Sequence, residues 1–455
     1  MDRLYSAHLE DWLAADKRKP LVVRGARQVG KTWLVRHLAE SSDRQLLELN
    51  LEKRPQLASL FASNDPEQIL LNLSAVLAQA IDPEHCLLFI DEIQVAPELL
   101  GKLRWFAEDL PELPVIVAGS LLDFSLAQHS FSMPVGRIGY LYLEPLSFEE
   151  FLLAMGRKNL YEYLLAYYFD IDIPIAIHEQ LMTLFKEYTL VGGLPEAISS
   201  WVTERSLIKI NQVHHDLLAT YRDDFYKYNG RMAVEKLDEV MMAVPKMLGQ
   251  KFVHSQINPG LQSSAAKQAL ALLHKARICH PVISCFANGI PLAAEMNAKF
   301  HKEIFLDSGL ACAALGLNFE QINAVDELIL INRGGIAEQL VGQLLRTIGP
   351  SYIEPALYYW RRDVKGSNAE IDYVIQYGSS VIPVEVKAGS TGTLKSLHLF
   401  MELKKITLAM RVNSDLPSNT EVEIKGHGSE KVRYTLLSMP FYLLGQTHRL
   451  LKKYY

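Results

Sequence analysis

Residues 25–32 read Gly25-Ala26-Arg27-Gln28-Val29-Gly30-Lys31-Thr32 and fit the spacing G-x-x-x-x-G-K-[ST] at every required position. The apolar run 21–23 before them predicts a buried strand, and residues 33–38 after them favour a helix. Strand, glycine loop and helix together form an anion site, because backbone N–H groups and the helix dipole both favour phosphate there. We therefore expect the octapeptide to bind nucleotide phosphates, with Lys31 at the β- and γ-phosphates and Thr32 on Mg²⁺.

A second motif supplies the acids that such a site needs. The apolar run 86–90 ends in Asp91-Glu92, which is typical of a buried parallel strand with carboxylates at its carboxyl end. Ligands bind at that edge of open α/β sheets. Asp91 is expected at the Mg²⁺ site, behind the direct ligands, and Glu92 is expected to polarise the attacking water. The alternative is a strand that merely ends in a helix-capping aspartate.

Two further positions are candidates for contact with the γ-phosphate. Runs 45–51 and 115–118 predict strands, and the second is followed by Gly119-Ser120. Ser120 is expected to sense the γ-phosphate, to cap the next helix, or to do both. Arg137 precedes the strand-like run 140–143 and is expected to stabilise charge in phosphoryl transfer, in its own chain or in a neighbour's. A plain surface arginine is the alternative.

Composition bounds the class of protein. A chain of 455 residues suggests about two to four domains, and 49% hydrophobic with 22% charged residues is ordinary for soluble globular proteins. Neither an apolar run of membrane-spanning length nor a signal-peptide core is found, so we expect no membrane contact. The four cysteines are scattered without a C-x-x-C pair, which suits a reducing cytoplasm and argues against zinc or a disulfide framework.

A second constellation lies near the C-terminus. Run 371–375 carries Asp372 and predicts a strand, and run 381–387 predicts another, with Glu385 and Lys387 on one face. A turn at 378–380 lets them pair as a hairpin, and Glu338 lies upstream on a helix-like run. Such acids with a lysine suit one or two Mg²⁺ or Mn²⁺ ions in phosphodiester cleavage. Acids buried together repel one another unless a cation binds or one is protonated. The alternative is a solvated Glu–Lys pair on a strand.

Several segments together carry a resemblance to a known family. They are residues 21–32, 88–94, 118–120, 134–137, 144–148, 191–195 and 221–225. With them the chain resembles, over nearly its full length, AAA-superfamily ATPases of bacteria and archaea that have a nuclease-like C-terminal domain of unknown function. Helix, strand with Asp372, then strand with Glu385 and Lys387 is also the order of the PD-(D/E)XK restriction-endonuclease-like fold, with Glu338 as its helical acid. The proline usual before the first strand acid is replaced by Ile371.

The resemblance implies an α/β fold with four parts. They are a three-layer P-loop NTPase core of AAA type at 1–146, a helical lid at 147–231, a winged-helix-like segment at 232–330 and a restriction-endonuclease-like α/β domain at 331–455. The winged-helix-like segment is expected to pack rather than to read DNA. Residues 331–455 hold 16 Lys and Arg against 11 Asp and Glu, a net charge of +5 that is compatible with nucleic-acid contact.

The sequence therefore predicts a cytoplasmic, Mg²⁺-dependent ATP-hydrolysing protein. Its nucleotide state is expected to act on a nuclease-like domain whose partner is DNA or RNA. An arginine that acts across subunits would require a homo-oligomer. The alternative is a nucleotide-controlled signalling or assembly switch, whose nuclease-like domain only binds a partner.

Overall fold

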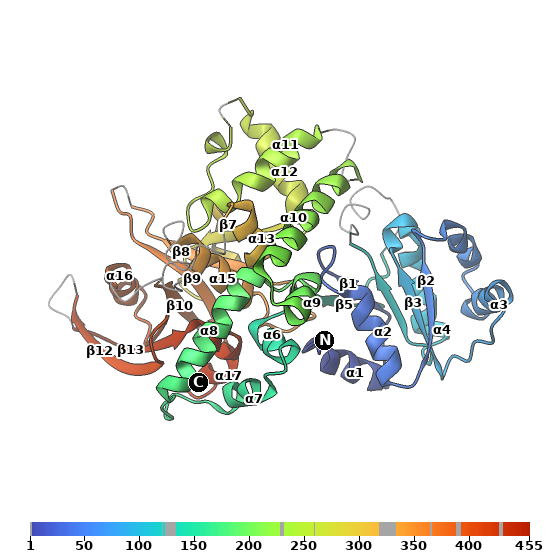
Figure 1. Cartoon of the computed structure of the whole chain (residues 1–455), viewed down its shortest axis with the longest axis horizontal. Helices are drawn as coiled ribbons and strands as arrows, with labels where there is room; N and C mark the ends of the chain where they lie inside the picture. Colours follow the sequence, from blue (N-terminus) through green and yellow to red (C-terminus); the bar gives the residue numbers. More distant parts are fainter. Residues whose placement is uncertain are drawn as a thin grey trace. The chain divides into compact units, whose positions relative to one another are not determined.

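The computed structural model describes residues 2–120, 122, 133–227, 232–258, 260–317, 334–364, 366–387, 393–426 and 431–455. The chain divides into two compact units (Figure 1). The first comprises Met1–Glu144 with the short segments Lys275–Arg277 and Pro350–Glu354. The second comprises Pro145–His274, Ile278–Gly349 and Pro355–Tyr455. Among the described residues, no helix combines the length and the apolar character that crossing a membrane requires.

The first unit is built on a five-stranded sheet in the order β2-β3-β4-β1-β5, in which every pairing is parallel. Its strands are β1 (Leu21–Arg24), β2 (Gln45–Asn50), β3 (Cys86–Asp91), β4 (Val115–Ala118) and β5 (Gly139–Tyr142). Because all five are parallel, their carboxyl ends share one edge of the sheet. The P-loop follows β1, Asp91 ends β3 and Ser120 comes shortly after β4, so all three lie at that edge.

Helices cover both faces of this sheet. They are α1 (Tyr5–Ala14), α2 (Lys31–Ser41), α3 (Pro66–Leu77) and α4 (Leu103–Asp109), with 3₁₀ turns η1 (Pro55–Phe61), η2 (Ile93–Val95) and η3 (Pro97–Lys102). On β3, Leu88 shares a hydrophobic core with Leu73 of α3 and Phe106 of α4. Leu87 points to the opposite face and is also fully buried. The near-continuous apolar strands are thus explained by burial on two sides.

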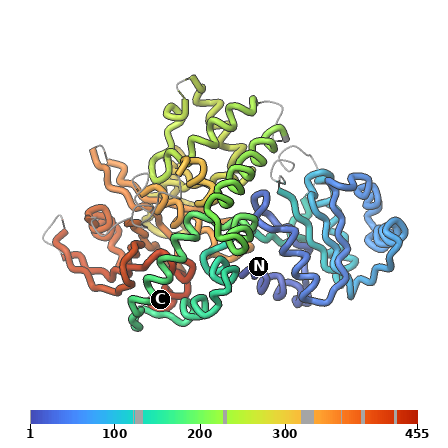
Figure 2. Tube along the Cα trace, viewed as in Figure 1, coloured from blue at the N-terminus to red at the C-terminus, as the bar shows by residue number. Residues whose placement is uncertain are grey.

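The second unit combines helices with a large mixed sheet. Its helices are α6 (Phe148–Ala154), α7 (Lys158–Ala166), α8 (Ile175–Val191), α9 (Pro195–Glu204), α10 (Leu207–Asp224), α11 (Val234–Ala243), α12 (Ser263–Lys275), α13 (Ser308–Ala314), α15 (Gly335–Leu345), α16 (Lys395–Lys404) and α17 (Thr447–Leu451). The first of these helices begins directly after Ser147, where Ser147 and Glu150 form a reciprocal capping box. Figure 2 traces this unit from its green helices to its red C-terminal strands.

Eight strands form the sheet of the second unit, in the order β12-β13-β11-β10-β9-β8-β6-β7. They are β6 (Cys279–Cys285), β7 (Met296–Phe305), β8 (Leu357–Arg361), β9 (Glu370–Tyr377), β10 (Ser380–Val386), β11 (Leu408–Asn413), β12 (Ser418–Lys425) and β13 (Lys431–Pro440). The predicted hairpin is formed by β9 and β10, with Ser380 opposite Tyr377. Strands β8, β9 and β10 are successively antiparallel, and β10 pairs with β11 in parallel.

The segment expected to be winged-helix-like does not stand apart. Its strands β6 and β7 pair with each other, and β6 pairs in parallel with β8 of the C-terminal region. An edge strand has unpaired backbone groups, and pairing with another strand satisfies their hydrogen bonds. No local sequence pattern indicates which strand will be the partner. The segment therefore shares a sheet with the C-terminal strands. The boundaries expected at residues 231 and 330 fall outside the described residues.

Candidate functional site

The two glycines of the octapeptide have separate structural reasons. Gly30 adopts φ +95° and stands immediately before α2, a left-handed conformation that glycine adopts without strain. Gly25 lies so close to the end of β5 that a Cβ there would be 2.5 Å from the carbonyl oxygen of Leu143. The loop is thus tightly wound between β1 and α2, as a phosphate-binding loop requires.

Lys31 is held inside this loop. Its Nζ donates hydrogen bonds to the carbonyl oxygens of Gly25 at 3.1 Å and Ala26 at 2.7 Å. Burial lowers the pKa of the Lys31 ammonium to about 8. The ammonium is therefore desolvated. Its hydrogen bonds go to neutral carbonyls, and Glu92 and Asp91 only partly offset the burial, so an anionic phosphate would improve its environment.

Asp91 is fixed through both of its carboxylate oxygens. Oδ2 accepts a 2.9 Å hydrogen bond from the Thr32 hydroxyl, and Oδ1 accepts a 3.0 Å bond from the backbone N–H of Glu92. The side chain is buried, and this burial raises the pKa of Asp91. The hydroxyl and the carboxylate are hard oxygen donors of the kind Mg²⁺ prefers, so these residues fit the expected ion.

Gln94, which the sequence analysis did not single out, connects Glu92 to the end of β4. Its Nε2 donates a 2.5 Å hydrogen bond to Oε2 of Glu92, whose backbone is left-handed at φ +55°. Its side chain also passes directly over Gly119, where a Cβ would collide with it. Ser120 follows Gly119 and is buried. The helix that Ser120 was expected to cap begins at residues outside the described part of the chain.

Arg137 lies far from the P-loop of its own unit. β5 begins with Gly139 opposite Leu21, the first residue of β1, whereas the P-loop follows the last residue of β1. Because the strands are parallel, Arg137 is at the opposite edge of the sheet. There its half-exposed guanidinium donates a 2.6 Å hydrogen bond to Glu108 of α4. The structure does not bring Arg137 to the nucleotide site of the same chain.

A different arginine occupies the P-loop edge. The Arg277 guanidinium lies 5.2 Å from the ring centroid of Tyr142, the last residue of β5, and pairs with Glu354 at 2.7 Å. It is close enough to Lys31 to contribute to the lowering of that pKa. Residues 275–277 belong to the first unit despite their distance in sequence. No motif marks Arg277, so sequence analysis missed it.

Sequence analysis also missed Arg3, whose side chain supports the P-loop through hydrogen bonds to the backbone. Its buried guanidinium donates to the carbonyl oxygens of Val29 and Glu144, each at 2.8 Å. One side chain thereby ties the P-loop to the segment that leaves β5. Charge-assisted hydrogen bonds of this kind are the strong ones in proteins.

The C-terminal acids gather around a lysine. Lys302 of β7 is buried, and its Nζ lies 2.9 Å from Glu338 of α15 and 3.8 Å from Asp372 of β9, and it also pairs with Glu370. Burial raises the pKa of Glu338 to about 8. The cation needed among buried acids is thus an ammonium from a strand that the sequence analysis assigned to another domain. Neither Lys302 nor Glu370 was predicted.

Glu385 and Lys387 lie beside this cluster as predicted from strand periodicity. Lys387 Nζ is 2.7 Å from Glu385 Oε1, and Asp372 Oδ2 accepts the backbone N–H of Val386 at 2.8 Å. Burial and the charge of Asp372 raise the pKa of Glu385 to about 7. Over the described residues, however, Glu338, Asp372 and Glu385 do not bring their oxygens together as the ligands of one metal ion.

Comparisons with family models give three matches along the chain. Residues 17–152 match a family described as an AAA domain. Residues 182–321 and 333–427 match two families, each described as a domain of unknown function (DUF8612 and DUF4143). None of the curated proteins matches the chain.

Two solved structures have low overall similarity to the chain. A Pif1 helicase from Bacteroides in complex with ADP-AlF3 and ssDNA is 19% identical, with 41% of this chain and 50% of that chain covered and a TM-score of 0.22. The chain thus spans half the length of that helicase. The Thermotoga maritima RuvB Holliday junction branch migration motor is 15% identical, with 60% and 84% covered and a TM-score of 0.28. Residues 17–152, which match the AAA family, include the P-loop and the hydrogen bond between Thr32 and Asp91.

Proposed function

We propose that this protein binds ATP with Mg²⁺ and hydrolyses it. The observation that carries the proposal is the hydrogen bond of 2.9 Å between Thr32 Oγ1 and Asp91 Oδ2. It joins the motif hydroxyl to the acid at the end of β3, the pair that holds Mg²⁺ in P-loop enzymes. Bound Mg²⁺ supplies charge neutralisation at the β- and γ-phosphates.

The remaining residues take distinct roles in this proposal. Backbone N–H groups of residues 25–32 bind the phosphates, and Lys31 exchanges its carbonyl partners for phosphate oxygens. Glu92 orients and polarises the attacking water, and Gln94 positions Glu92 through their hydrogen bond. Ser120, buried at the end of β4, contacts the γ-phosphate.

Two arginines divide the charge stabilisation. Arg277 acts on the nucleotide of its own chain, a role supported by its place over Tyr142 at the P-loop edge. Arg137 acts on the nucleotide of a neighbouring copy in a homo-oligomer. Its position at the opposite edge of the sheet, exposed beside Glu108, supports an action between chains and opposes one within the chain.

Steady-state ATPase assays with three variants test the proposal. Lys31→Ala should lose both ATP binding and hydrolysis. Glu92→Gln should still bind ATP but lower kcat by a factor on the order of 100, because the water is no longer activated. Glu98→Gln, an exposed neighbour on η3, is the matched control and should keep wild-type turnover. Wild-type kcat in Glu92→Gln would refute the hydrolytic role.

We propose further that the acid cluster of the second unit acts on DNA or RNA under the control of the nucleotide. The order α15, β8, β9, β10, α16, β11, with the pairings given above, supports a PD-(D/E)XK-like arrangement. The contact between Lys387 and Glu385 supports it too. Binding of Mg²⁺ or Mn²⁺ there requires Lys302 to leave the acids, because an ammonium already pairs with Glu338.

Cleavage assays separate this function from its alternative. Protein with ATP and Mn²⁺ should cut single- or double-stranded DNA or RNA, and Asp372→Ala should not. A signalling or assembly switch whose C-terminal domain only binds a partner predicts no cleavage of any substrate. Absence of cleavage together with unchanged nucleic-acid binding in Asp372→Ala would overturn the nuclease role.

A further inference from the structure

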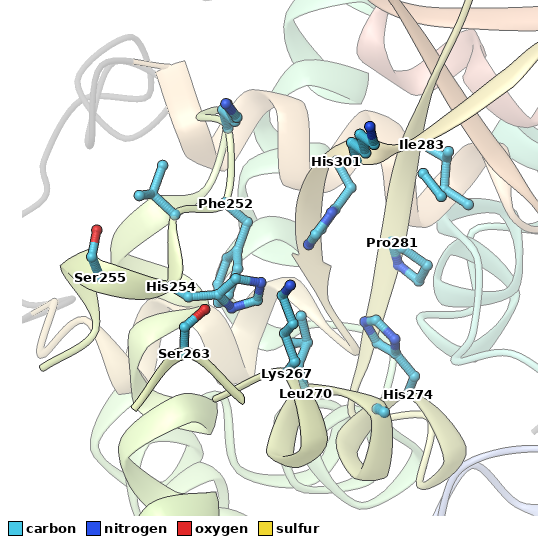
Figure 3. A pocket seen from close by; sticks show the side chains of 15 residues that line it. Phe252, His254, Ser255, Ser263, Lys267, Leu270, His274, Pro281, Ile283 and His301 are labelled. Carbon is cyan, nitrogen blue, oxygen red and sulfur yellow. The ribbon is translucent and has the colours of Figure 1, made fainter. Parts of the chain in front are cut away.

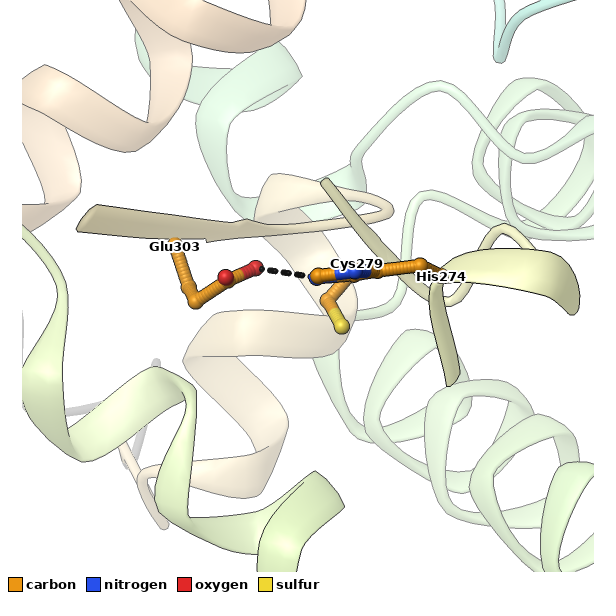
Figure 4. A group of neighbouring side chains, drawn as sticks. All are labelled: His274, Cys279 and Glu303. Atoms are coloured by element: carbon orange, nitrogen blue, oxygen red, sulfur yellow. Dashed lines mark hydrogen bonds and ion pairs between the residues drawn. The ribbon is translucent and has the colours of Figure 1, made fainter. Parts of the chain in front are cut away.

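Three side chains of different chemistry, none of them a member of the two sites described above, meet in the second unit. His274 lies in the last turn of α12, Cys279 begins β6, and Glu303 lies on β7 (Figure 4). One potential ligand atom from each lies within 4.8 Å of the other two. His274 Nε2 is 2.9 Å from Oε2 of Glu303. Cys279 and Glu303 are fully buried, and the side chain of His274 is 29% exposed.

A second histidine approaches the same carboxylate. His301 precedes Glu303 by two residues on β7, so both side chains point to one face of the strand. Its Nε2 is 3.5 Å from Oε1 of Glu303. Among the described residues, neither of these two atoms has a hydrogen-bond partner. A fully buried carboxylate oxygen without a hydrogen bond is costly, and it is the kind of atom that a cation satisfies.

The donor set indicates which cation fits. Two imidazoles, a thiolate and a carboxylate are the ligand types of Zn²⁺, and four of them complete a tetrahedral site. Metal–ligand bonds of about 2.0–2.3 Å place tetrahedral ligand atoms about 3–4 Å apart. The His274–Glu303 and His301–Glu303 distances, 2.9 and 3.5 Å, are close to that spacing. We propose that His274, Cys279 and Glu303 bind a Zn²⁺ ion, and that a shift of His301, which lies outside this group of mutually close ligand atoms, supplies the fourth ligand.

The site has a route of entry. His274 and His301 line a cavity of about 990 Å³ (Figure 3). Cys279 and Glu303 are not among its lining residues and are fully buried. The imidazole nitrogens therefore meet an incoming ion first, and the buried thiol and carboxylate complete its coordination. Thiol deprotonation accompanies this step, and the released proton leaves to solvent through the cavity.

A Zn²⁺ ion at this site would connect three elements whose proximity the sequence alone does not reveal. The ligands come from the end of α12 and from both strands of the β6–β7 hairpin. Because the unfolded chain does not hold these ligands together, binding energy adds to folding stability. The absence of a C-x-x-C pair argued against zinc at the sequence level. The ligands instead combine a single cysteine with residues of other types.

Metal analysis of the full-length protein tests the proposal. Protein stripped with a chelator and reloaded with Zn²⁺ should retain about one ion per chain after desalting. Cys279→Ser and Glu303→Gln should retain far less. Cys285→Ser is the matched control, since Cys285 is a buried cysteine on the same strand but outside the group, and it should retain zinc as wild type does. Equal retention by Cys279→Ser and wild type would overturn the assignment.

Cobalt substitution gives an independent readout. Co²⁺ bound to the reloaded protein should show a thiolate-to-metal charge-transfer band, absent in Cys279→Ser and present in Cys285→Ser. If substitution of a buried ligand prevents folding, His274→Gln replaces it as the test variant, because His274 is partly exposed. It should weaken Zn²⁺ binding at least tenfold. If the folded wild-type protein retains no metal, the proposal is overturned, and His274 and Glu303 form an ordinary ion pair. Lys31→Ala should bind Zn²⁺ normally, which separates this outcome from failure of the ATPase proposal.

Discussion

Thr32 and Asp91 are 59 positions apart in sequence, yet the Thr32 hydroxyl donates a 2.9 Å hydrogen bond to Asp91 Oδ2. Thr32 lies in the first turn of α2, and Asp91 ends β3. The carboxylate also accepts the N–H of Glu92, so its orientation is set before nucleotide arrives. If Thr32 and Asp91 hold Mg²⁺ as proposed, their site is thereby preorganised, which reduces the free energy spent on ordering it during binding.

Substitutions of Thr32 should show this preorganisation. Thr32→Ala removes the hydroxyl and leaves the buried Asp91 oxygen unpaired, at a cost of about 1–3 kcal/mol in stability. We expect it to lower kcat and to raise the Mg²⁺ concentration needed for half-maximal ATPase activity. Thr32→Ser keeps the hydroxyl and should restore most of both, which a Mg²⁺ titration of initial rates measures. Equal defects in the two variants would show that the hydroxyl is not the group that matters.

ATP binding should take up a proton above neutral pH. Burial lowers the pKa of Lys31 to about 8 in the free protein, and phosphate charge raises it in the complex. Affinity is therefore full below about pH 8 and falls as pH rises through that value, by up to about tenfold per pH unit. Calorimetry in buffers of different ionisation enthalpy measures the uptake. It should be near zero at about pH 7 and approach one at about pH 9 in wild type and in the control Lys17→Ala. Uptake that is the same at both pH values would contradict the assignment.

Mixtures of inactive variants should distinguish the roles of Arg137 and Arg277 by the ATPase activity that they recover. Arg277→Ala should lower kcat whatever copies surround it. Arg137→Ala leaves its own P-loop intact, whereas Lys31→Ala keeps Arg137 but has no working P-loop. If Arg137 acts between chains, mixing these two inactive proteins restores part of the ATPase activity. Arg277→Ala mixed with Lys31→Ala should restore none. No recovery in the first mixture, with oligomers present by light scattering, would exclude the action of Arg137 across chains.

Lys302→Met should turn the acid cluster into a divalent-cation site. Without the ammonium, Glu338, Glu370 and Asp372 repel one another, so the variant should melt at a lower temperature than wild type. In wild type, burial raises the pKa of Glu338 to about 8 even beside Lys302, so the charge that Lys302 neutralises grows as pH rises through that value. The loss of stability should therefore be larger above about pH 8 than near pH 5.

Thermal melts with and without Mn²⁺ test the same variant further. In the absence of ATP, Mn²⁺ should raise the melting temperature of Lys302→Met and leave wild type almost unchanged, since the ammonium already occupies the acids. Lys299→Met, an exposed lysine on the same strand, is the control and should behave as wild type. A variant insensitive to both pH and Mn²⁺ would show that the acids do not depend on Lys302.

Local chemistry was sufficient to predict the strands, the P-loop and the acids that follow the strands. The octapeptide encodes its own geometry, because Gly25 and Gly30 meet requirements of close approach and left-handed backbone within eight residues. Asp91 follows from an apolar strand whose end must lie at the ligand edge of a parallel sheet. The contact between Glu385 and Lys387 follows from the two-residue period of a strand. In each case a local residue pattern marks the position, although the close approach at Gly25 is to Leu143 of another segment.

Tertiary structure alone placed the groups that complete each site. Arg277 reaches the P-loop edge, and Lys302 enters the acid cluster, because strands and loops distant in sequence pack together. The same packing places Arg137 at the sheet edge opposite its own P-loop, and it brings His274, Cys279 and Glu303 close together. Pairing of strands such as β6 and β8 depends on burial and on unpaired backbone groups across the whole sheet, so no local pattern specifies it. The sequence by itself determined which chemistry each motif supports. Long-range packing decided which charged side chains lie next to each motif.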